Sequence, residues 1–544
     1  MVRRRHQLAL LSLPLCERAH LTMGYIVTSG PVVGLMAGFV PIKDFRFVNI
    51  SVIGSGFGGL GAAIRLAARG HRVNVFEARD QPGGRAYTYR QDGFMFDGGP
   101  TVITAPWMIE DLFTLAGRNL RDYVELVPLD PFYRIYFDDG SAFEYAASTD
   151  QMLANIAAFS CDDDADGYLR MLQKTARIFE KGFLELGDQP FLRFGDMARI
   201  SPELLKLGSH QSVYQLVKRH ISDDKLRQAL SFHPLLVGGN PFTTTSIYAL
   251  IHHLEREWGV WFAKGGTAAL IDALVQLFQE LGGTLHLGAQ VDKIVTRNGR
   301  ATCVRLGDGR EYRADVVVSN ADISNTLEHM LEPNALKATT RMRLRTLQDS
   351  MSLMVIYFGT DRLYRGEDGP PLAHHTIMLG PRYEALLDDV FKHKVLAEDF
   401  SLYLHMPTLT DSSLAPTGCE TFYALSPVPN LNGAVDWERA ARPYRDRIMS
   451  FLEERYLPNL GRHIVTERVI DPRHFAEELQ SRAGAAFSFE PKLTQSAWFR
   501  PHNRSSDVRN LYFVGAGTHP GAGVPGVLTS ARIADALIAS DVMS

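Results

Sequence analysis

A short glycine-rich segment and a later acidic residue have the first recognisable chemistry in the chain. Residues 54–59 read Gly-Ser-Gly-Phe-Gly-Gly, which fits GxGxxG, and Glu77 follows Gly56 by 21 residues. The first glycine of this pattern permits a tight turn, the second lets backbone approach a pyrophosphate, and the third allows close packing of helix on strand. A carboxylate at position 77 can accept hydrogen bonds from ribose hydroxyls and repels a 2′-phosphate. The spacing predicts a dinucleotide site in which NAD and FAD are both open and NADP is disfavoured.

Such a motif functions only when a strand and a helix hold it. Residues 47–53 are apolar, rich in β-branched side chains and closed by glycine, which is typical of a buried parallel strand. Residues 57–69 place apolar side chains at helical spacing, and Gly70 can end that helix. Residues 73–76 predict a second strand. Together these elements form a βαβ unit.

The same alternation returns twice farther along the chain. We expect a helix over 267–282, strands over 284–296, 301–306 and 311–318 with a turn at Asp308-Gly309, then a strand over 511–514 and a helix from about 526 to 539. The predicted fold is α/β, a discontinuous Rossmann-type domain interleaved with an α+β domain. The nucleotide domain is assigned to 47–125, 255–345 and 486–544, and the second domain, for substrate binding and membrane association, to 126–254 and 346–485. Residues 1–46 are expected to lie outside the fold.

Five further segments carry a family resemblance. They are Glu-Ala-Arg-Asp-Gln-Pro-Gly-Gly-Arg-Ala at 77–86, Phe-Asp-Gly-Gly-Pro-Thr-Val-Ile-Thr at 96–104, Leu-Leu-Val-Gly-Gly-Asn-Pro-Phe at 235–242, Glu-Trp-Gly-Val-Trp-Phe at 257–262 and Gly-Ala-Gly-Thr-His-Pro-Gly-Ala-Gly-Val-Pro-Gly at 515–526. The first resembles the extended fingerprint of FAD-dependent amine oxidases and carotenoid desaturases. All five in this order, between about 48 and 538, resemble the bacterial-type phytoene desaturases. The last segment differs from that of amine oxidases.

The resemblance implies a flavoprotein that binds FAD non-covalently and desaturates phytoene or a related C40 polyene, with quinone or oxygen as electron acceptor. A glycine-rich backbone at 515–526 can approach a flat ring closely, and the start of the following helix favours an anionic reduced flavin. The predicted cofactor contacts are Gly54, Ser55, Gly56, Phe57, Gly58, Gly59, Glu77, Gly83, Gly84, Arg85, Val291, Gly515, Gly517, Thr518 and Val524.

Three side chains are candidates for the chemical step. His519 lies within the predicted flavin loop, where it is either a catalytic group or a hydrogen-bonded structural imidazole. Asp196 and Arg199 stand three residues apart, so on a helix they would share a face. They form either a solvated surface pair or a carboxylate held by arginine beside the polyene. Dehydrogenation of a hydrocarbon needs little acid–base chemistry from the protein, because the flavin accepts the hydride.

Composition limits the partners. The 544 residues carry a net charge of −4, so no global positive field would attract nucleic acid. Residues 191–220 nevertheless hold five basic and two acidic residues among apolar ones, which fits an interfacial helix or an ordinary amphipathic helix. A C40 hydrocarbon would be drawn from a bilayer, so we expect a cytoplasmic protein peripherally associated with the inner membrane. A homo-oligomer is left open.

Other features favour simple interpretations. The four cysteines lack disulfide or zinc-binding spacing, so no metal is expected. The acidic run at 161–166 is expected to be a solvated turn that caps a helix starting near Gly167. The basic and apolar start of the chain imitates a signal peptide without a cleavage site, so 1–46 is either dispensable or a targeting segment.

The alternatives to phytoene desaturation are a carotenoid isomerase, a desaturase of hydroxylated or methoxylated carotenoids, an FAD amine oxidase, and a non-catalytic isoprenoid-binding escort protein.

Overall fold

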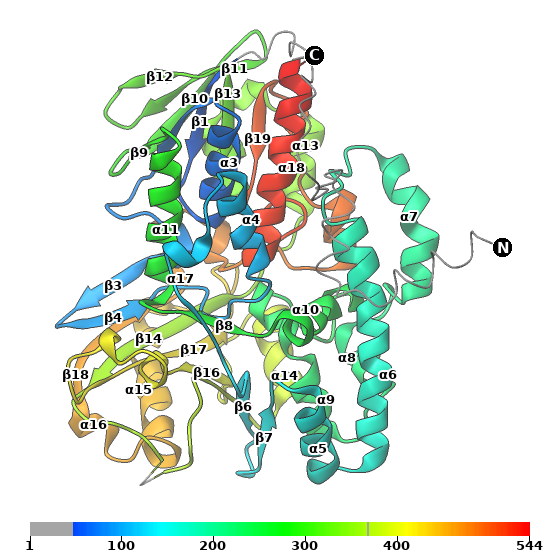
Figure 1. Cartoon of the computed structure of the whole chain (residues 1–544), viewed down its shortest axis with the longest axis vertical. Coiled ribbons are helices and arrows are strands. Elements are labelled where there is room, and N and C mark those ends of the chain that lie inside the picture. Colours follow the sequence, from blue (N-terminus) through cyan, green and yellow to red (C-terminus); the bar gives the residue numbers. More distant parts are fainter. Residues whose placement is uncertain (1–46, 367–368, 544) are drawn as a thin grey trace, which may run out of the picture. The chain divides into compact units, whose positions relative to one another are not determined.

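The computed structural model describes residues 47–366 and 369–543, so the predictions on 1–46 lie outside it. A parallel sheet with the strand order β19-β13-β1-β2-β9 is assembled from distant segments (Figure 1). Its strands are β1 (Asn49–Ile53), β2 (Arg72–Phe76), β9 (Thr284–His286), β13 (Val316–Ser319) and β19 (Leu511–Phe513). Because all neighbours run parallel, their carboxyl ends meet at one edge, where ligands of such sheets bind. The predicted Rossmann-type fold is confirmed.

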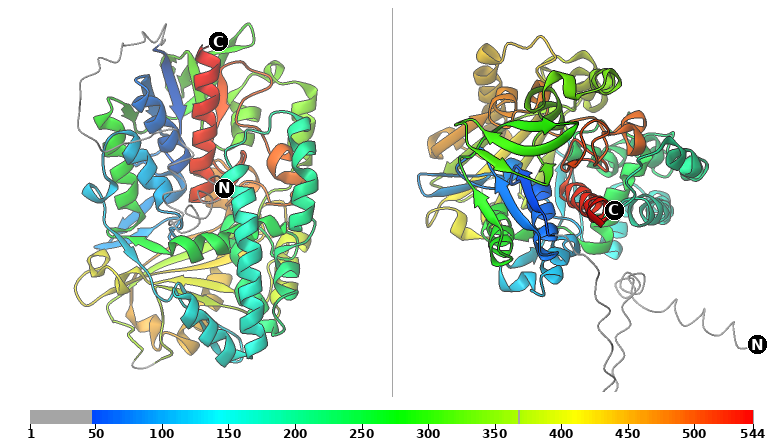
Figure 2. Two further views of the ribbon diagram at one scale, coloured as in Figure 1. Left: turned by 45° about the vertical axis from the view of Figure 1, so that its right-hand side comes forward. Right: turned by 90° about the horizontal axis from the view of Figure 1, so that it is seen from above.

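Helices cover one face of this sheet, and a small antiparallel sheet covers the other. The helices are α3 (Phe57–Ala68), α4 (Trp107–Leu115), α11 (Gly266–Glu280) and α18 (Val524–Met543); the small sheet contains β10 (Val291–Arg297), β11 (Arg300–Leu306) and β12 (Glu311–Arg313). Along β13, Val316 and Val318 pack toward the helices and Val317 toward the small sheet, as the strand period of two requires. Figures 1 and 2 show α3 and α18 side by side, although they come from opposite ends of the described chain.

A larger sheet forms the second layer, with the strand order β18-β14-β17-β16-β15-β6-β7. Its strands are β6 (Tyr133–Tyr136), β7 (Ala142–Tyr145), β14 (Ser352–Thr360), β15 (His375–Met378), β16 (Leu402–His405), β17 (Glu420–Val428) and β18 (Ile464–Ile470). Neighbours are antiparallel except for β15 and β6. Every residue of β14 is buried, because both faces of this strand are covered.

Two pairs of antiparallel strands and a set of helices complete the described chain. The pairs are β3 (Thr88–Gln91) with β4 (Phe94–Asp97), and β5 (Leu126–Pro128) with β8 (Trp261–Ala263). The remaining α-helices are α5 (Thr149–Phe159), α6 (Asp162–Phe179), α7 (Phe194–Leu207), α8 (Val213–Lys218), α9 (Asp224–Ser231), α10 (Leu250–Trp258), α12 (Ile323–Asn325), α13 (Ala338–Thr346), α14 (Tyr383–Asp388), α15 (Trp437–Arg455), α16 (Leu460–His463) and α17 (Pro472–Glu477). Within the described ranges, none of these helices has the length and apolar character needed to cross a membrane.

The structure corrects three predicted boundaries. The strand expected over 311–318 is divided into β12 and β13, which belong to different sheets. The strand expected over 284–296 is divided into β9 and β10 around Gly288, whose φ of +60° is left-handed and interrupts extended backbone. The acidic run is the first turn of α6 rather than a turn before it, because carboxylates stabilise the positive end of a helix. Within that turn, Asp164 is buried and accepts hydrogen bonds from the N–H groups of Ser222 and Asp223 at 2.6 and 3.1 Å.

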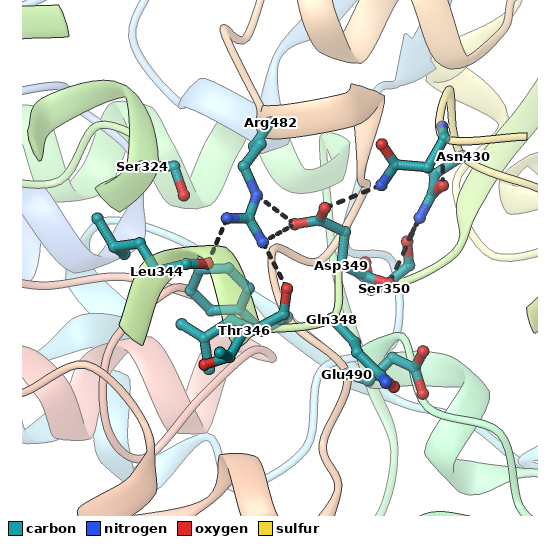
Figure 3. A network of polar contacts seen from close by, with 12 residues as sticks. Ser324, Leu344, Thr346, Gln348, Asp349, Ser350, Asn430, Arg482 and Glu490 are labelled. Atoms are coloured by element: carbon teal, nitrogen blue, oxygen red, sulfur yellow. Dashed lines mark hydrogen bonds and ion pairs between the residues drawn. The ribbon is translucent and has the colours of Figure 1, made fainter. Parts of the chain in front are cut away.

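A polar network secures the segment that leads from α13 into β14 (Figure 3). Arg482 donates from Nε to Asp349 Oδ1 at 2.8 Å and from Nη1 to the Leu344 carbonyl at 2.7 Å. On the other side, Asn430 Nδ2 donates to the Ser350 carbonyl at 2.8 Å. Loops after α13, β17 and α17 are therefore joined where the two layers meet.

Candidate active site

The predicted glycine turn lies between β1 and α3, at the carboxyl edge of the parallel sheet. Gly54 has a φ of +89°, and its N–H donates to the Phe76 carbonyl at 2.8 Å. A Cβ on Gly59 would lie 2.0 Å from the Gly54 carbonyl oxygen, so only glycine lets the helix approach the turn this closely. A Cβ on Gly58 would lie 2.6 Å from Asn320 Oδ1 and 3.1 Å from Gly515 N. The turn, the end of β13 and the loop after β19 thus converge here.

Glu77 follows β2 directly and is buried. One carboxylate oxygen accepts hydrogen bonds from the backbone N–H of Ser55 at 2.8 Å and from its hydroxyl at 2.7 Å. The other oxygen accepts from the N–H of Arg79 at 3.1 Å. Glu77 therefore holds the glycine turn in place and keeps a carboxylate beside it, as the predicted ribose contact requires.

A second turn, formed by Gly83, Gly84 and Arg85, faces the first. Gly83 N–H donates to the Ser55 carbonyl at 3.1 Å, and both glycines have positive φ values, of +118° and +58°. Arg85 donates from Nη2 to Ser481 Oγ at 2.8 Å, while its buried Nε has no partner among the described residues. Burial lowers the pKa of this guanidinium and raises the pKa of nearby Asp322. A partly buried arginine with an unused donor suits an anionic ligand.

The loop between β19 and α18 supplies another side of the site. Gly515 has a φ of +101° and donates its N–H to Ser530 Oγ at 2.9 Å. Gly515 and Val524 line the central cavity, whereas Gly517 and Thr518 stand behind that wall. Thr518 donates its hydroxyl to the Gly515 carbonyl at 3.1 Å, which fixes the loop from behind.

Two residues at the site were not predicted from the sequence. Asn320 follows β13 and stands between the glycine turn and Gly515. One feature of the sequence could have indicated this role. Asn320 directly follows a buried strand, and parallel strands end at a common edge of the sheet, where the site lies. Arg500 is fully buried and donates to the Ala516 carbonyl at 2.7 Å, which supports the loop; no pattern in its own segment indicated this contact.

These turns border a cavity of about 560 Å³ that extends toward the large sheet. Its lining includes Gly54, Gly56, Phe57, Gly58, Glu77, Gly83, Gly84, Arg85 and Val291 of the predicted cofactor contacts. Beyond them the wall is largely apolar and aromatic, with Phe232, Leu235, Leu236, Ile377, Tyr403 and Leu425. The cavity therefore joins a polar backbone cradle to an apolar chamber. Ser55 and Gly59 stand outside the wall and shape the turn.

His519 lies in this wall and is buried. Its ring meets the ring of Phe191 edge-on, with centroids 5.1 Å apart, and neither ring nitrogen has a side-chain or backbone partner among the described residues within hydrogen-bond geometry. Burial lowers its pKa to about 3, so the imidazole is neutral at physiological pH.

Asp196 and Arg199 lie in the first two turns of α7. Their side chains pair at 3.2 Å, and they are 38% and 78% exposed. Asp196 also accepts a hydrogen bond from the N–H of Arg193 at 3.2 Å, which caps the helix. On the same helix Met197, Ile200 and Leu204 line the cavity, and neither member of the pair does. This placement favours the solvated surface pair.

Comparisons with known proteins agree with this geometry. Residues 57–538 match the flavin containing amine oxidoreductase family. The lycopene-forming phytoene desaturase of Pseudescherichia vulneris is 52% identical over 492 residues, covering 90% of this chain and 99% of that protein. The neurosporene-forming phytoene desaturase of Cereibacter sphaeroides is 44% identical, covering 89% and 93%. A redesigned putrescine oxidase has the same fold, with a TM-score of 0.61, 15% identity, and coverage of 91% and 99%.

Fold and site together define an FAD-dependent oxidoreductase. The chain belongs to the flavin containing amine oxidoreductase family, and within it to the bacterial phytoene desaturases. The residues present fit FAD: glycines leave room for close approach at both turns, the Glu77 carboxylate stands beside the first turn, where it could hold a ribose, and Arg85 has an unused donor. The amine oxidase and escort-protein alternatives are not favoured.

Proposed function

We propose that this protein desaturates phytoene, a C40 hydrocarbon, toward neurosporene- or lycopene-type products. The observation that carries the proposal is the apolar chamber that continues from the cofactor cradle, because a hydrocarbon offers the protein only apolar surface to bind. The relatives named above are phytoene desaturases that form lycopene or neurosporene, which supports the same substrate. The number of desaturation steps is left open.

The cofactor supplies the hydride-accepting ring when it is bound. The chain's own contribution is orientation and exclusion of water, which the packed walls of the chamber provide. His519 belongs to the loop between β19 and α18 and lines the cavity. Because its pKa is about 3, it is a weak base, so we infer that it orients the substrate or the flavin loop and does not retain the proton that leaves the allylic carbon.

The proposed route of the substrate runs along α7, which lies at the outer edge of the molecule in Figure 1. One face of this helix lines the cavity, and elsewhere it exposes Phe194 by 59% and Leu205 by 53%. Arg199 is exposed on the same helix. Exposed apolar residues among basic ones suit the surface of an anionic bilayer. We infer peripheral membrane contact here, with a membrane quinone or oxygen as the electron acceptor.

The substrate is tested by expressing the full chain in bacteria that accumulate phytoene and separating the pigments by chromatography. We expect neurosporene- or lycopene-type chromophores that are absent from cells with empty vector. An FAD-loaded protein that leaves phytoene unchanged would refute the proposed substrate. Oxidation of polar amines by the same preparation would instead support the amine oxidase alternative.

The membrane contact is tested by flotation of the FAD-loaded protein with anionic vesicles. We expect binding that weakens at high salt and decreases when Phe194 and Leu205 are both changed to serine. Met342→Ser is the matched control, because Met342 is an exposed apolar residue on a different helix, α13. Equal flotation of both variants and the wild type would contradict a contact through α7.

A further inference from the structure

Three buried histidines meet beside the central cavity, outside the cofactor cradle. His375 begins β15 and His405 ends β16, and the two residues face each other in the antiparallel register of these strands. His374 immediately precedes β15. All three side chains are buried, and each can offer a ring nitrogen within 4.8 Å of the nitrogens of the other two. Nothing in the proposed desaturation uses them.

The inner nitrogens of these rings are unpartnered. Within the described part of the chain, Nε2 of His374, His375 and His405 has no hydrogen-bond partner. Buried polar atoms are normally hydrogen-bonded, so three unpartnered nitrogens at one place call for an explanation. Neutral imidazole is the form of histidine that binds metal ions.

Outer contacts fix the orientation of two rings. His374 Nδ1 lies 2.7 Å from Thr410 Oγ1, and His375 Nδ1 lies 2.6 Å from the Tyr403 hydroxyl. The Tyr403 oxygen is in turn 2.8 Å from Thr101 Oγ1, so it can accept from the histidine and donate to the threonine. With both Nδ1 atoms protonated, the lone pairs of the Nε2 atoms are free. Metal-binding histidines are typically held through their other nitrogen in this way.

A carboxylate lies beside the cluster. Asp97 ends β4 and is buried; its Oδ1 accepts the N–H of Thr267 at 2.8 Å, at the start of α11. Its Oδ2 is unpartnered in the described structure and lies 4.0 Å from His405 Nε2. Three neutral imidazoles and one carboxylate offer three nitrogens, one oxygen and a single negative charge.

We propose that His374, His375 and His405 form a binding site for a zinc-like divalent cation, with Asp97, which approaches His405, as an additional oxygen donor. A set of nitrogen and oxygen donors in four-coordinate geometry is typical of zinc, with bonds of about 2.0–2.2 Å. Ligand atoms in such a site are about 3.3 Å apart, so the imidazole nitrogens would approach one another by at most about 1.5 Å. The bound ion would link β15 and β16 of the large sheet to β4 and the start of α11.

The expectation that no metal binds rested on the spacing of the cysteines, none of which belongs to this cluster. His405 is 30 residues from His375, and Asp97 is distant from both, so only the pairing of β15 with β16 and the packing of β4 bring them together.

The test is elemental analysis of the full-length, FAD-loaded protein, purified without a histidine tag, given zinc and then passed through a chelating resin. We expect about one zinc ion per chain. X-ray absorption at the zinc edge should show nitrogen and oxygen neighbours at about 2.0–2.1 Å, with the outer scattering of imidazole. This measurement requires no variant and so does not depend on whether variants fold.

Variants then assign the site. His375→Gln and His405→Gln should lose the zinc, whereas His463→Gln should keep it, because His463 is a partly exposed histidine that pairs with Asp361. Far-ultraviolet circular dichroism and FAD content report whether each variant is folded. A wild-type protein that retains no metal above the buffer blank would overturn the proposal. Equal retention of zinc by folded His375→Gln and His405→Gln variants would also overturn it, since the ion would then be bound elsewhere.

Discussion

Replacing Gly59 with alanine should loosen the cofactor cradle, because the new Cβ would lie 2.0 Å from the Gly54 carbonyl oxygen. Real Cβ atoms essentially never approach other heavy atoms within 3.0 Å, so helix α3 and the turn must separate by about 1 Å. The atom in the way is a backbone carbonyl oxygen, which cannot move aside by a side-chain rotation. Gly61→Ala is the matched control on the same helix, since its Cβ would lie 3.0 Å from Leu528 Cδ2, the end of a flexible side chain.

Overpacking of this kind costs about 1–3 kcal/mol. The apoprotein can relieve the strain by opening the turn, but bound FAD needs the turn closed, so the cost reappears as weaker binding. At about 1.4 kcal/mol for each factor of ten, the FAD affinity of Gly59→Ala should fall about 5- to 150-fold. Both substitutions gain the same helix propensity of about 1 kcal/mol over glycine, so that gain cancels in the comparison.

The assay is titration of the apoprotein with FAD, followed by quenching of flavin fluorescence, for the wild type and both variants. Thermal unfolding of each apoprotein reports strain that remains without the cofactor. We expect Gly61→Ala to bind FAD within a few-fold of wild type. Wild-type affinity in Gly59→Ala, or an equal loss in both variants, would refute the argument that the close approach of Gly59 to Gly54 shapes the cradle.

Three further outcomes follow from the same geometry. Glu77→Gln should weaken FAD binding about tenfold or more, because charge-assisted bonds such as those to Ser55 contribute about 1.5–3 kcal/mol; unchanged titration would contradict this. In the unfolded protein the imidazole of His519 takes up a proton below its ordinary pKa of 6.5, whereas in the folded protein it does so only near pH 3. The free energy of unfolding therefore falls as the pH decreases between these two values. Urea unfolding should show that the wild type loses about 1 kcal/mol more than His519→Gln between pH 6.5 and 5.5, and parallel losses would count against a neutral His519. Asp196→Asn should keep turnover, product pattern and FAD content, because its pair with Arg199 is exposed, and lost turnover with FAD bound would instead support the catalytic hypothesis.

The local elements were predictable because their determinants are contiguous. The strand, glycine turn, helix and Glu77 fall within one short stretch, and the structure places β1, α3 and β2 within a residue or two of the predicted bounds. The acidic run was misassigned for a physical reason. Aspartates favour both turns and the first turn of a helix, and the contact of Asp164 with the start of α9, which selects the helix, spans almost 60 residues.

What the sequence alone determined is the chemistry that spacing encodes: a dinucleotide cradle, the acid beside it, and the family resemblance that implies FAD. Only the tertiary structure decided which side chains that are distant in the sequence come together. Asn320 reaches Gly58 and Gly515 because parallel strands end at one edge. The histidines of β15 and β16 meet because these strands pair, and His405 comes within 4.0 Å of Asp97 because β4 packs beside them. Asp196 faces solvent because of the orientation of α7 against the cavity. Such contacts depend on packing between segments far apart in the chain, and no local pattern specifies them.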